Sequence, residues 1–120
     1  MNIEEYREFC LSLPGVSESM PFDDRVLVMK VGGKIFALFD VDAFQSINLK
    51  CNPDLALELR EKYQAVQPGY HMNKRHWNTV TVNSDVGDEL IREWTKGSYA
   101  LIVASLSKKL RSELNQLLKL

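Results

Sequence analysis

The chain has 120 residues, of which 45% are hydrophobic and 26% are charged, a size and composition typical of one globular domain. Its formal net charge of −1 argues against a strongly basic nucleic-acid binder, and its apolar runs are far too short to span a bilayer. The first residues are acidic where a signal peptide would be basic, so we expect a single domain over residues 1–120, monomeric and cytoplasmic, with no membrane partner.

The charged residues are distributed unevenly along the chain. Residues 1–24 contain six acidic residues and one basic residue, whereas residues 95–120 contain five basic residues and one acidic residue. Between them, residues 63–84 contain Lys74 and Arg75 and no acidic residue. A molecule with this distribution can present one positive face despite its small net charge.

The first predicted element is a helix from about Ile3 to Leu13. Asn2 is a good N-cap, and Glu5 lies at the capping-box position three residues later. Pro14 and Gly15 are expected to end the helix. One face of this helix is apolar at helical spacing, and it consists of Ile3, Tyr6, Phe9, Cys10 and Leu13.

A β-hairpin is predicted next. The runs Arg25–Val31 and Lys34–Asp40 are rich in β-forming residues, and Gly32-Gly33 between them is a two-residue turn signal. Both runs are more continuously apolar than alternating, which indicates a sheet face well covered by helices. A third short strand is expected at about Ser46–Lys50.

Three residues mark the start of a second helix. Asn52 suits the cap, Pro53 the first helical position, and Asp54 the positive end of the helix dipole. The helix is expected to end near Tyr63, and a short extended piece at Ala65–Gln67 follows it. Its apolar face consists of Leu55, Ala56, Leu59 and Tyr63.

The segment Pro68–Val80 combines a turn signal at its start with a β-branched run at its end. That run belongs to a strand predicted over Trp77–Asn83, with threonines on one face and valines on the other. Between the ends lie polar and aromatic residues that a core segment would not carry, because buried polar groups must be satisfied. A loop that a scaffold presents to a partner has this composition.

Three helices are predicted after that strand. Asp85 suits the cap of a helix over Val86–Lys96, which Gly97 is expected to stop. A second helix runs from Ser98 to Ala104, and a last one follows a cap at Ser107 and reaches the C-terminus. Four leucines share one side of the last helix: Leu110, Leu114, Leu117 and Leu118. Together these elements predict an α+β fold, in which N-terminal and C-terminal helices pack on an antiparallel sheet.

The two cysteines, Cys10 and Cys51, do not form a CxxC pair, which excludes a zinc knuckle or a thioredoxin-type motif. We expect both to be reduced thiols.

His71 and His76 lie five residues apart with no carboxylate in the loop, and zinc sites need three or four ligands at recognisable spacing. We therefore expect no metal, no cofactor and no catalytic group. An iron-binding role for the acidic N-terminal residues is a weaker alternative to a solvated face; these residues are Glu4, Glu5, Glu8, Glu18, Asp23 and Asp24.

Several motifs of the chain resemble those of the MmcQ/YjbR family of small bacterial proteins, over nearly its whole length. They are Leu13-Pro14-Gly15 with Pro21-Phe22, the hairpin Lys30–Ala37, Ile47–Cys51, Pro68–Val80 and Ser98-Tyr99. The resemblance implies a frataxin-like (CyaY-like) α+β fold. This family is commonly labelled DNA-binding after a double-wing arrangement in its fold, and it supplies no catalytic residue.

We therefore expect a non-catalytic DNA-binding protein that uses the segment 68–80. Lys74 and Arg75 are expected to contact phosphates. The other candidates would stack on unpaired bases, read base edges or shape the site, and they are Tyr70, His71, Asn73, His76, Trp77 and Asn78. A late basic cluster could extend the positive face if the fold brings it near: Lys108, Lys109 and Arg111.

Two alternatives to DNA binding remain open from the sequence. In the first, the polar residues of 68–80 satisfy one another and Trp77 packs into the core, so the segment is purely structural. In the second, the aromatic and arginine side chains bind a protein partner or a small ligand. Burial of Trp77 would count against both recognition roles.

Overall fold

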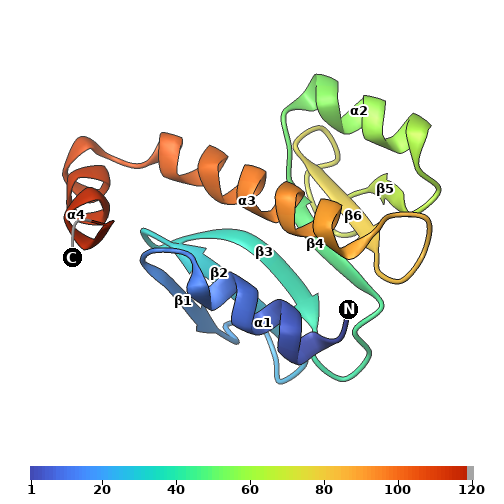
Figure 1. The fold of residues 1–120 in the computed structure, drawn as a ribbon, viewed down its shortest axis with the longest axis horizontal. Coiled ribbons are helices and arrows are strands. Elements are labelled where there is room, and N and C mark those ends of the chain that lie inside the picture. The colour runs from blue at the N-terminus through green and yellow to red at the C-terminus, as the bar shows by residue number, and fades with distance from the viewer. Residues whose placement is uncertain (119–120) are drawn as a thin grey trace.

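The computed structural model describes residues 1–118 and has one six-stranded antiparallel sheet with four helices (Figure 1). The elements are α1 (Ile3–Ser12), β1 (Val16–Ser19), β2 (Val26–Val31), β3 (Lys34–Asp40), β4 (Ser46–Lys50), α2 (Pro53–Lys62), β5 (Val66–Pro68), β6 (Trp77–Thr81), α3 (Asp88–Ser105) and α4 (Lys108–Leu118). The strand order is β1-β2-β3-β4-β6-β5. The predicted α+β class is confirmed.

Helices α1, α2 and α3 pack on one face of the sheet, and α3 runs across it as the longest element (Figure 1). Alternation along β4 directs Ile47 and Leu49 into this interface, where both are buried. Asn48 and Lys50 occupy the alternate positions and are half-buried. The sheet therefore has a helix-covered face and an opposite face, and the two must be considered separately.

Buried hydrogen bonds join the helices to the sheet and to one another. The Tyr6 hydroxyl of α1 lies 2.8 Å from the Thr95 hydroxyl of α3, and burial raises the pKa of Tyr6 well above its ordinary value. The Ser98 hydroxyl donates to the carbonyl of Phe36 at 2.6 Å and accepts from the amide of Lys50 at 2.9 Å. Helix α3 is thereby held against both β3 and β4.

The helix caps that the sequence predicts at three positions are confirmed. Asn2 accepts from the amide of Glu5 at 2.9 Å, and Asn52 accepts from the amide of Asp54 at 3.0 Å. Ser107 accepts from the amide of Leu110 at 3.3 Å. The Glu5 carboxylate accepts from the Asn2 side-chain amide rather than from its backbone, so the capping box is only partly formed.

Strand β1 was not expected from the sequence. Its four residues, Val16–Ser19, pair with β2 in antiparallel register. Two of the four are serines, so the strand has little of the apolar signal on which sequence patterns depend. A contact with α1 helps to position the strand, because the Arg7 guanidinium donates to the Glu18 carboxylate of β1.

The predicted break between two helices at Gly97 is wrong, because α3 is continuous from Asp88 to Ser105. The buried residues of α3 are Ile91, Thr95, Ser98 and Ile102, and they form a helical stripe that passes Gly97 without interruption. Packing of this stripe on the sheet outweighs the roughly 1 kcal/mol that a glycine costs inside a helix.

The predicted cap at Asp85 is also wrong. Helix α3 begins at Asp88 after Gly87, which makes no side-chain cap bond. The Asp85 carboxylate instead accepts from the backbone amides of Gln64 and Ala65, at 2.7 and 2.8 Å. These two donors, that of Gln64 first, lower the pKa of Asp85.

The leucine side predicted for the last helix is only partly buried. Leu114 is buried and Leu110 is half-buried, but Leu117 is 52% exposed. The Leu118 side chain and residues 119–120 lie outside the described residues. Among residues 1–118, no helix has both the length and the apolar character that a bilayer crossing requires.

Candidate functional site

Residues Gly69–His76 connect β5 to β6, and we call this connection the 69–76 loop. Its base is held by the Arg60 guanidinium of α2. Nε donates to Oδ1 of Asn78 at 2.7 Å, and Nη2 donates to the carbonyls of Trp77, at 3.3 Å, and of Lys74. One forked side chain thus positions both the loop and the start of β6.

Asn78, which the sequence suggested as a base-reading residue, lies in the core. Its side chain is only 2% exposed. Its amide oxygen accepts from Arg60, and its amide nitrogen donates to the carbonyl of Ala56 at 3.4 Å. Because both ends of the amide are engaged and shielded from solvent, we assign Asn78 a structural role in place of the expected contact with DNA.

Two further candidate residues are engaged inside the loop. Asn73 Oδ1 accepts from the amide of Arg75 at 3.0 Å, and its carbonyl accepts from the amides of His76 and Trp77. Lys74 Nζ donates to the carbonyl of Gly69 at 2.9 Å. The first alternative, in which the polar residues of the loop satisfy one another, is therefore partly confirmed. Lys74 contributes to the conformation of the loop itself.

Trp77 does not enter the core. It pairs with Lys50 in the β4–β6 register and lies on the face opposite to buried Asn78 and Val80, where it is half-buried. Gly69 packs closely against Trp77, since a Cβ at Gly69 would lie 2.8 Å from Trp77 Cβ and 2.9 Å from the Trp77 carbonyl oxygen. The expectation that a structural loop would place Trp77 inside the core is wrong.

Three further residues of the loop are exposed: Tyr70, His71 and Arg75. Tyr70 is 69% exposed, and its ring centroid lies 4.0 Å from that of His71. His71 has a φ of 59°, in the left-handed region that is uncommon for a residue other than glycine. Arg75 is exposed, and His76 is half-buried. Within residues 1–118, neither the Tyr70 hydroxyl nor the Arg75 guanidinium has a hydrogen-bond or ion-pair partner in the chain.

The fold does not bring the late basic cluster to this loop. Lys108, Lys109 and Arg111 lie on α4, beyond the far end of α3 from β5 and β6 (Figure 1). The acidic N-terminal residues do not gather either: Glu18 pairs with Arg7, and Asp23 accepts from the amides of Arg25 and Val26. No three His, Cys, Asp or Glu side chains within residues 1–118 are arranged to hold a metal ion.

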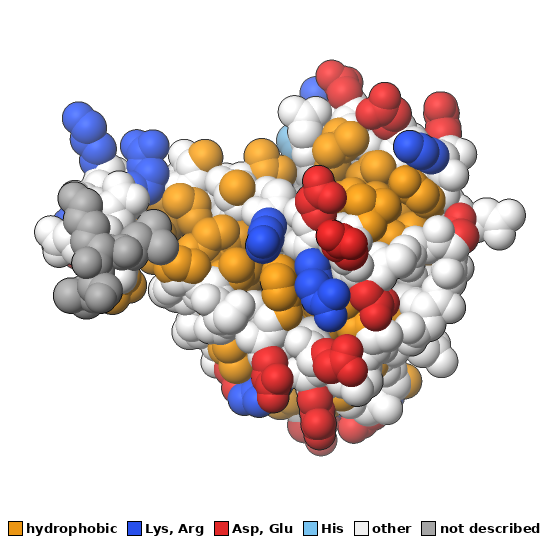
Figure 2. Space-filling view, in the orientation of Figure 1, with side chains coloured by type: hydrophobic (Ala, Val, Ile, Leu, Met, Phe, Trp, Pro, Cys, Tyr) orange, Lys and Arg blue, Asp and Glu red, His pale blue; other side chains and the backbone are white. Residues whose placement is uncertain are grey.

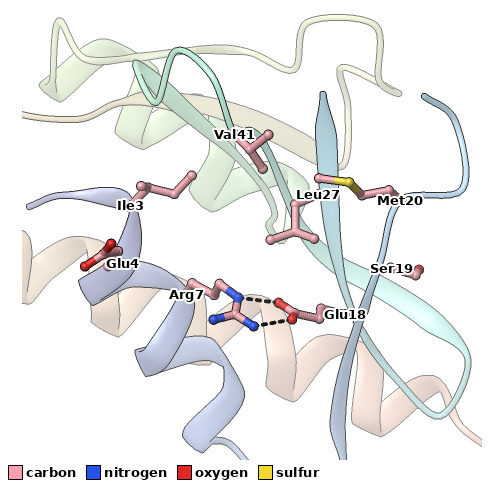
Figure 3. Close-up of a pocket in the computed structure, with 8 residues that line it drawn as sticks. All are labelled: Ile3, Glu4, Arg7, Glu18, Ser19, Met20, Leu27 and Val41. Carbon is pink, nitrogen blue, oxygen red and sulfur yellow. Dashed lines mark hydrogen bonds and ion pairs between the residues drawn. The ribbon is translucent and has the colours of Figure 1, made fainter. Parts of the chain in front are cut away.

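The surface also has two hollows. The first lies between α1 and the β1–β2 strands, where Figure 3 shows the Arg7–Glu18 ion pair beside Ile3, Met20 and Leu27. The second lies between α2 and α3 and encloses about 520 Å³. In Figure 2 it coincides with a concentration of hydrophobic side chains between these two helices.

The sequence did not predict the second hollow, because its hydrophobic pattern predicts that the leucines on the apolar face of α2 are buried in the core. Leu55 belongs to that predicted apolar face, yet it is 43% exposed at the rim of the hollow. Ala56 is fully buried as expected. The distance between α2 and α3 leaves Leu55 uncovered, and no local pattern reports that distance.

Comparisons with known proteins agree on one family. The family model for YjbR matches residues 11–101. YjbR of Escherichia coli strain K12 is 33% identical over 118 residues, covering 98% of this chain and all of YjbR. YbdF of Escherichia coli O157:H7 is 36% identical over 107 residues, covering 88% of each chain. Both are described as uncharacterised.

Solved structures show the same fold. The crystal structure of Deinococcus radiodurans DR2400 superposes with a TM-score of 0.88 at 39% identity, covering 95% of this chain and 88% of DR2400. A crystal structure from Pseudomonas syringae gives a TM-score of 0.71 at 26% identity, covering 84% of this chain and 98% of that one.

Proposed function

The chain belongs to the YjbR family, and on that premise we propose that it is a non-catalytic DNA-binding protein that holds unpaired bases with the 69–76 loop. Neither the matching family model nor the relatives name an activity, so the proposal rests on the chemistry of the loop.

One observation carries the proposal: the side chains of Tyr70 and His71 are exposed, and within the described chain neither makes a hydrogen bond or an ion pair. A tyrosine that is 69% exposed leaves apolar ring surface in water. The His71 ring lies against it at an interplanar angle of 51°, so the Tyr70 ring is the stacking platform and His71 supports it. Stacking of an unpaired base on such a platform covers this surface, and it needs no particular base because every base has a π-face.

The charge beside the platform suits a phosphate backbone. Arg75 is exposed, and its guanidinium can make forked contacts with phosphate oxygens. Lys50 and Trp77 lie side by side across the β4–β6 pairing, on the face next to the loop. With so few positive charges we expect weak, salt-sensitive binding.

The engaged residues support the site without reading bases. Asn73, Lys74 and Asn78 hold the loop in shape through the bonds already described. We therefore propose that Tyr70, His71 and Arg75 make the contacts with DNA, flanked by His76 and Trp77. This arrangement predicts little sequence specificity, because the Asn78 amide is buried and the Asn73 amide oxygen is bonded to the Arg75 backbone within the loop.

Fluorescence anisotropy of labelled DNA oligomers tests the proposal. We expect single-stranded DNA to bind more tightly than duplex. Tyr70→Ala should weaken binding of the single strand roughly 5- to 150-fold, the range expected for one stacked base, whereas Tyr70→Phe should keep most of it. Phe22→Ala, at another exposed aromatic residue (66% exposed), is the matched control and should bind as the natural protein does.

Equal binding by Tyr70→Ala and Phe22→Ala would refute the role of the loop. Absence of binding at low salt would refute the DNA proposal itself. The exposed tyrosine and arginine would then be assigned to a protein interface, since both residue types are common at interface hot spots.

A further inference from the structure

The hollow between α2 and α3 has the dimensions of a small-molecule site. We call it the α2–α3 groove. Its volume of about 520 Å³ lies within the roughly 300–1,000 Å³ usual for ligand pockets. It lies on the helix-covered face of the sheet, whereas Trp77 lies on the opposite face. The groove and the proposed DNA site are therefore different sites, and Lys50, which pairs with Trp77 and also lines the groove, lies at their border.

The groove has apolar walls and an apolar floor. Leu55 and Leu59 of α2 form one wall, and Trp94 and Leu101 of α3 form the other. Leu49 and Val80 of the sheet form the floor. The Trp94 ring is fixed by edge-on packing against Tyr63, with centroids 5.4 Å apart, which gives one wall a rigid aromatic surface.

The polar groups at the floor offer nothing to a ligand. The Asn78 amide is bonded at both ends, to Arg60 and to Ala56. The Ser98 hydroxyl donates to Phe36 and accepts from Lys50. A polar ligand group that reached this depth would lose its water and gain no partner, which is costly. The deep part of any ligand is therefore apolar.

The rim adds no net charge. Lys50 and Glu93 are the charged residues that line the groove, and they have opposite signs. The Cys51 thiol also borders it; partial burial raises the pKa of Cys51 above its ordinary value, so the thiol is neutral near pH 7. An uncharged ligand meets no electrostatic penalty here.

From these features we infer that the α2–α3 groove binds an uncharged, mainly apolar small molecule, such as one with fused aromatic rings or a medium-length acyl chain. Exposed Leu55 and Leu101, 43% and 37% accessible, would be covered when it binds. Burial of that surface supplies the driving force. This inference does not depend on DNA binding.

N-phenyl-1-naphthylamine, an uncharged fused-ring fluorophore, is a suitable probe. We expect saturable fluorescence enhancement with one site per chain. Leu55→Lys should weaken binding by about tenfold or more, because it places a charge at the apolar rim. Leu57→Lys makes the same change on the same helix at a residue that is 57% exposed and outside the groove, and it should leave binding unchanged.

The natural protein supplies a second readout. Bound probe should slow the reaction of Cys51 with a thiol reagent, and this result does not depend on any variant's stability. Non-saturable enhancement, equal loss in the two lysine variants, or unprotected Cys51 would each overturn the inference. Loss of binding in Met20→Lys but not in Leu55→Lys would place the probe in the hollow beside α1 instead, and would also overturn it.

Discussion

Arg60 of α2 donates a 2.7 Å hydrogen bond from Nε to Oδ1 of the buried Asn78 in β6. This contact joins a helix that borders the α2–α3 groove to the strand that carries the 69–76 loop. The same guanidinium reaches the carbonyls of Trp77 and Lys74. The conformation of the loop therefore depends on a residue near the end of α2, which strand β5 separates from the loop in the sequence.

Replacement of Asn78 by alanine should destabilise the protein. It removes an acceptor from Arg60 and a donor from the Ala56 carbonyl, and unsatisfied buried polar groups cost about 1–3 kcal/mol. Urea denaturation should show a loss of this size in the free energy of unfolding. Asn115→Ala, at an exposed position of α4, should change it by less than about 0.5 kcal/mol; a similar effect in both variants would contradict the structural role of Asn78.

Replacement of Gly97 by alanine should stabilise the protein by about 0.5–1 kcal/mol. Gly97 lies inside continuous α3, and a Cβ there would meet nothing within 4 Å. Gly87→Ala, outside the helix at its cap, should give no such gain, because glycine is preferred to alanine at that position. Destabilisation by Gly97→Ala, measured in urea, would indicate that the helix is interrupted there after all.

The sequence predicted those features that neighbouring residues determine. The caps at Asn2, Asn52 and Ser107 follow from a side chain and an amide two or three residues away. The hairpin follows from Gly32-Gly33, which both have positive φ. The continuity of α3 through Gly97 could not be predicted in this way, because it depends on contacts with strands that are distant in the sequence.

The polar and aromatic composition of residues 69–76 predicted correctly that they form a loop. It did not predict which of their side chains are exposed and which are bonded within the protein. Lys74 and Asn78 looked equivalent to Arg75 as polar candidates. Their engagement depends on Gly69 within the loop and on Arg60 of α2. Separating free from engaged side chains requires those tertiary contacts, which no spacing in the sequence reveals.

Asp85 should make the stability depend on pH. Backbone amides of Gln64 and Ala65 hold the pKa of its carboxyl below the ordinary value of 3.8. A carboxylate with a lowered folded-state pKa stabilises the protein above its unfolded-state pKa, and this contribution is lost as the pH falls through the folded-state pKa. Asp85→Ala should therefore lower the urea midpoint at pH 6, and the difference from the natural protein should shrink below pH 3.8. A difference that is constant over this range would contradict the assignment.

The two cysteines should differ in reactivity. Cys10 is fully buried, and burial raises its pKa to about 12, whereas Cys51 is half-buried beside the α2–α3 groove. A chromogenic disulfide reagent should titrate one thiol per native chain at pH 8, and both thiols in urea. Cys51→Ser should remove the native reaction. Equal reaction rates of the two thiols in the native protein would show that the core near Cys10 opens readily.

The most direct measurement of the central claim is the salt dependence of single-stranded DNA binding by two matched arginine variants. Arg75→Ala changes the 69–76 loop, and Arg111→Ala makes the same change in charge on α4, at the other end of the molecule (Figure 1). If Arg75 contacts a phosphate, the slope of log affinity against log salt should become shallower by about 0.7 in Arg75→Ala, with no change in Arg111→Ala. Equal slopes in the natural protein and both variants would contradict DNA binding through this loop.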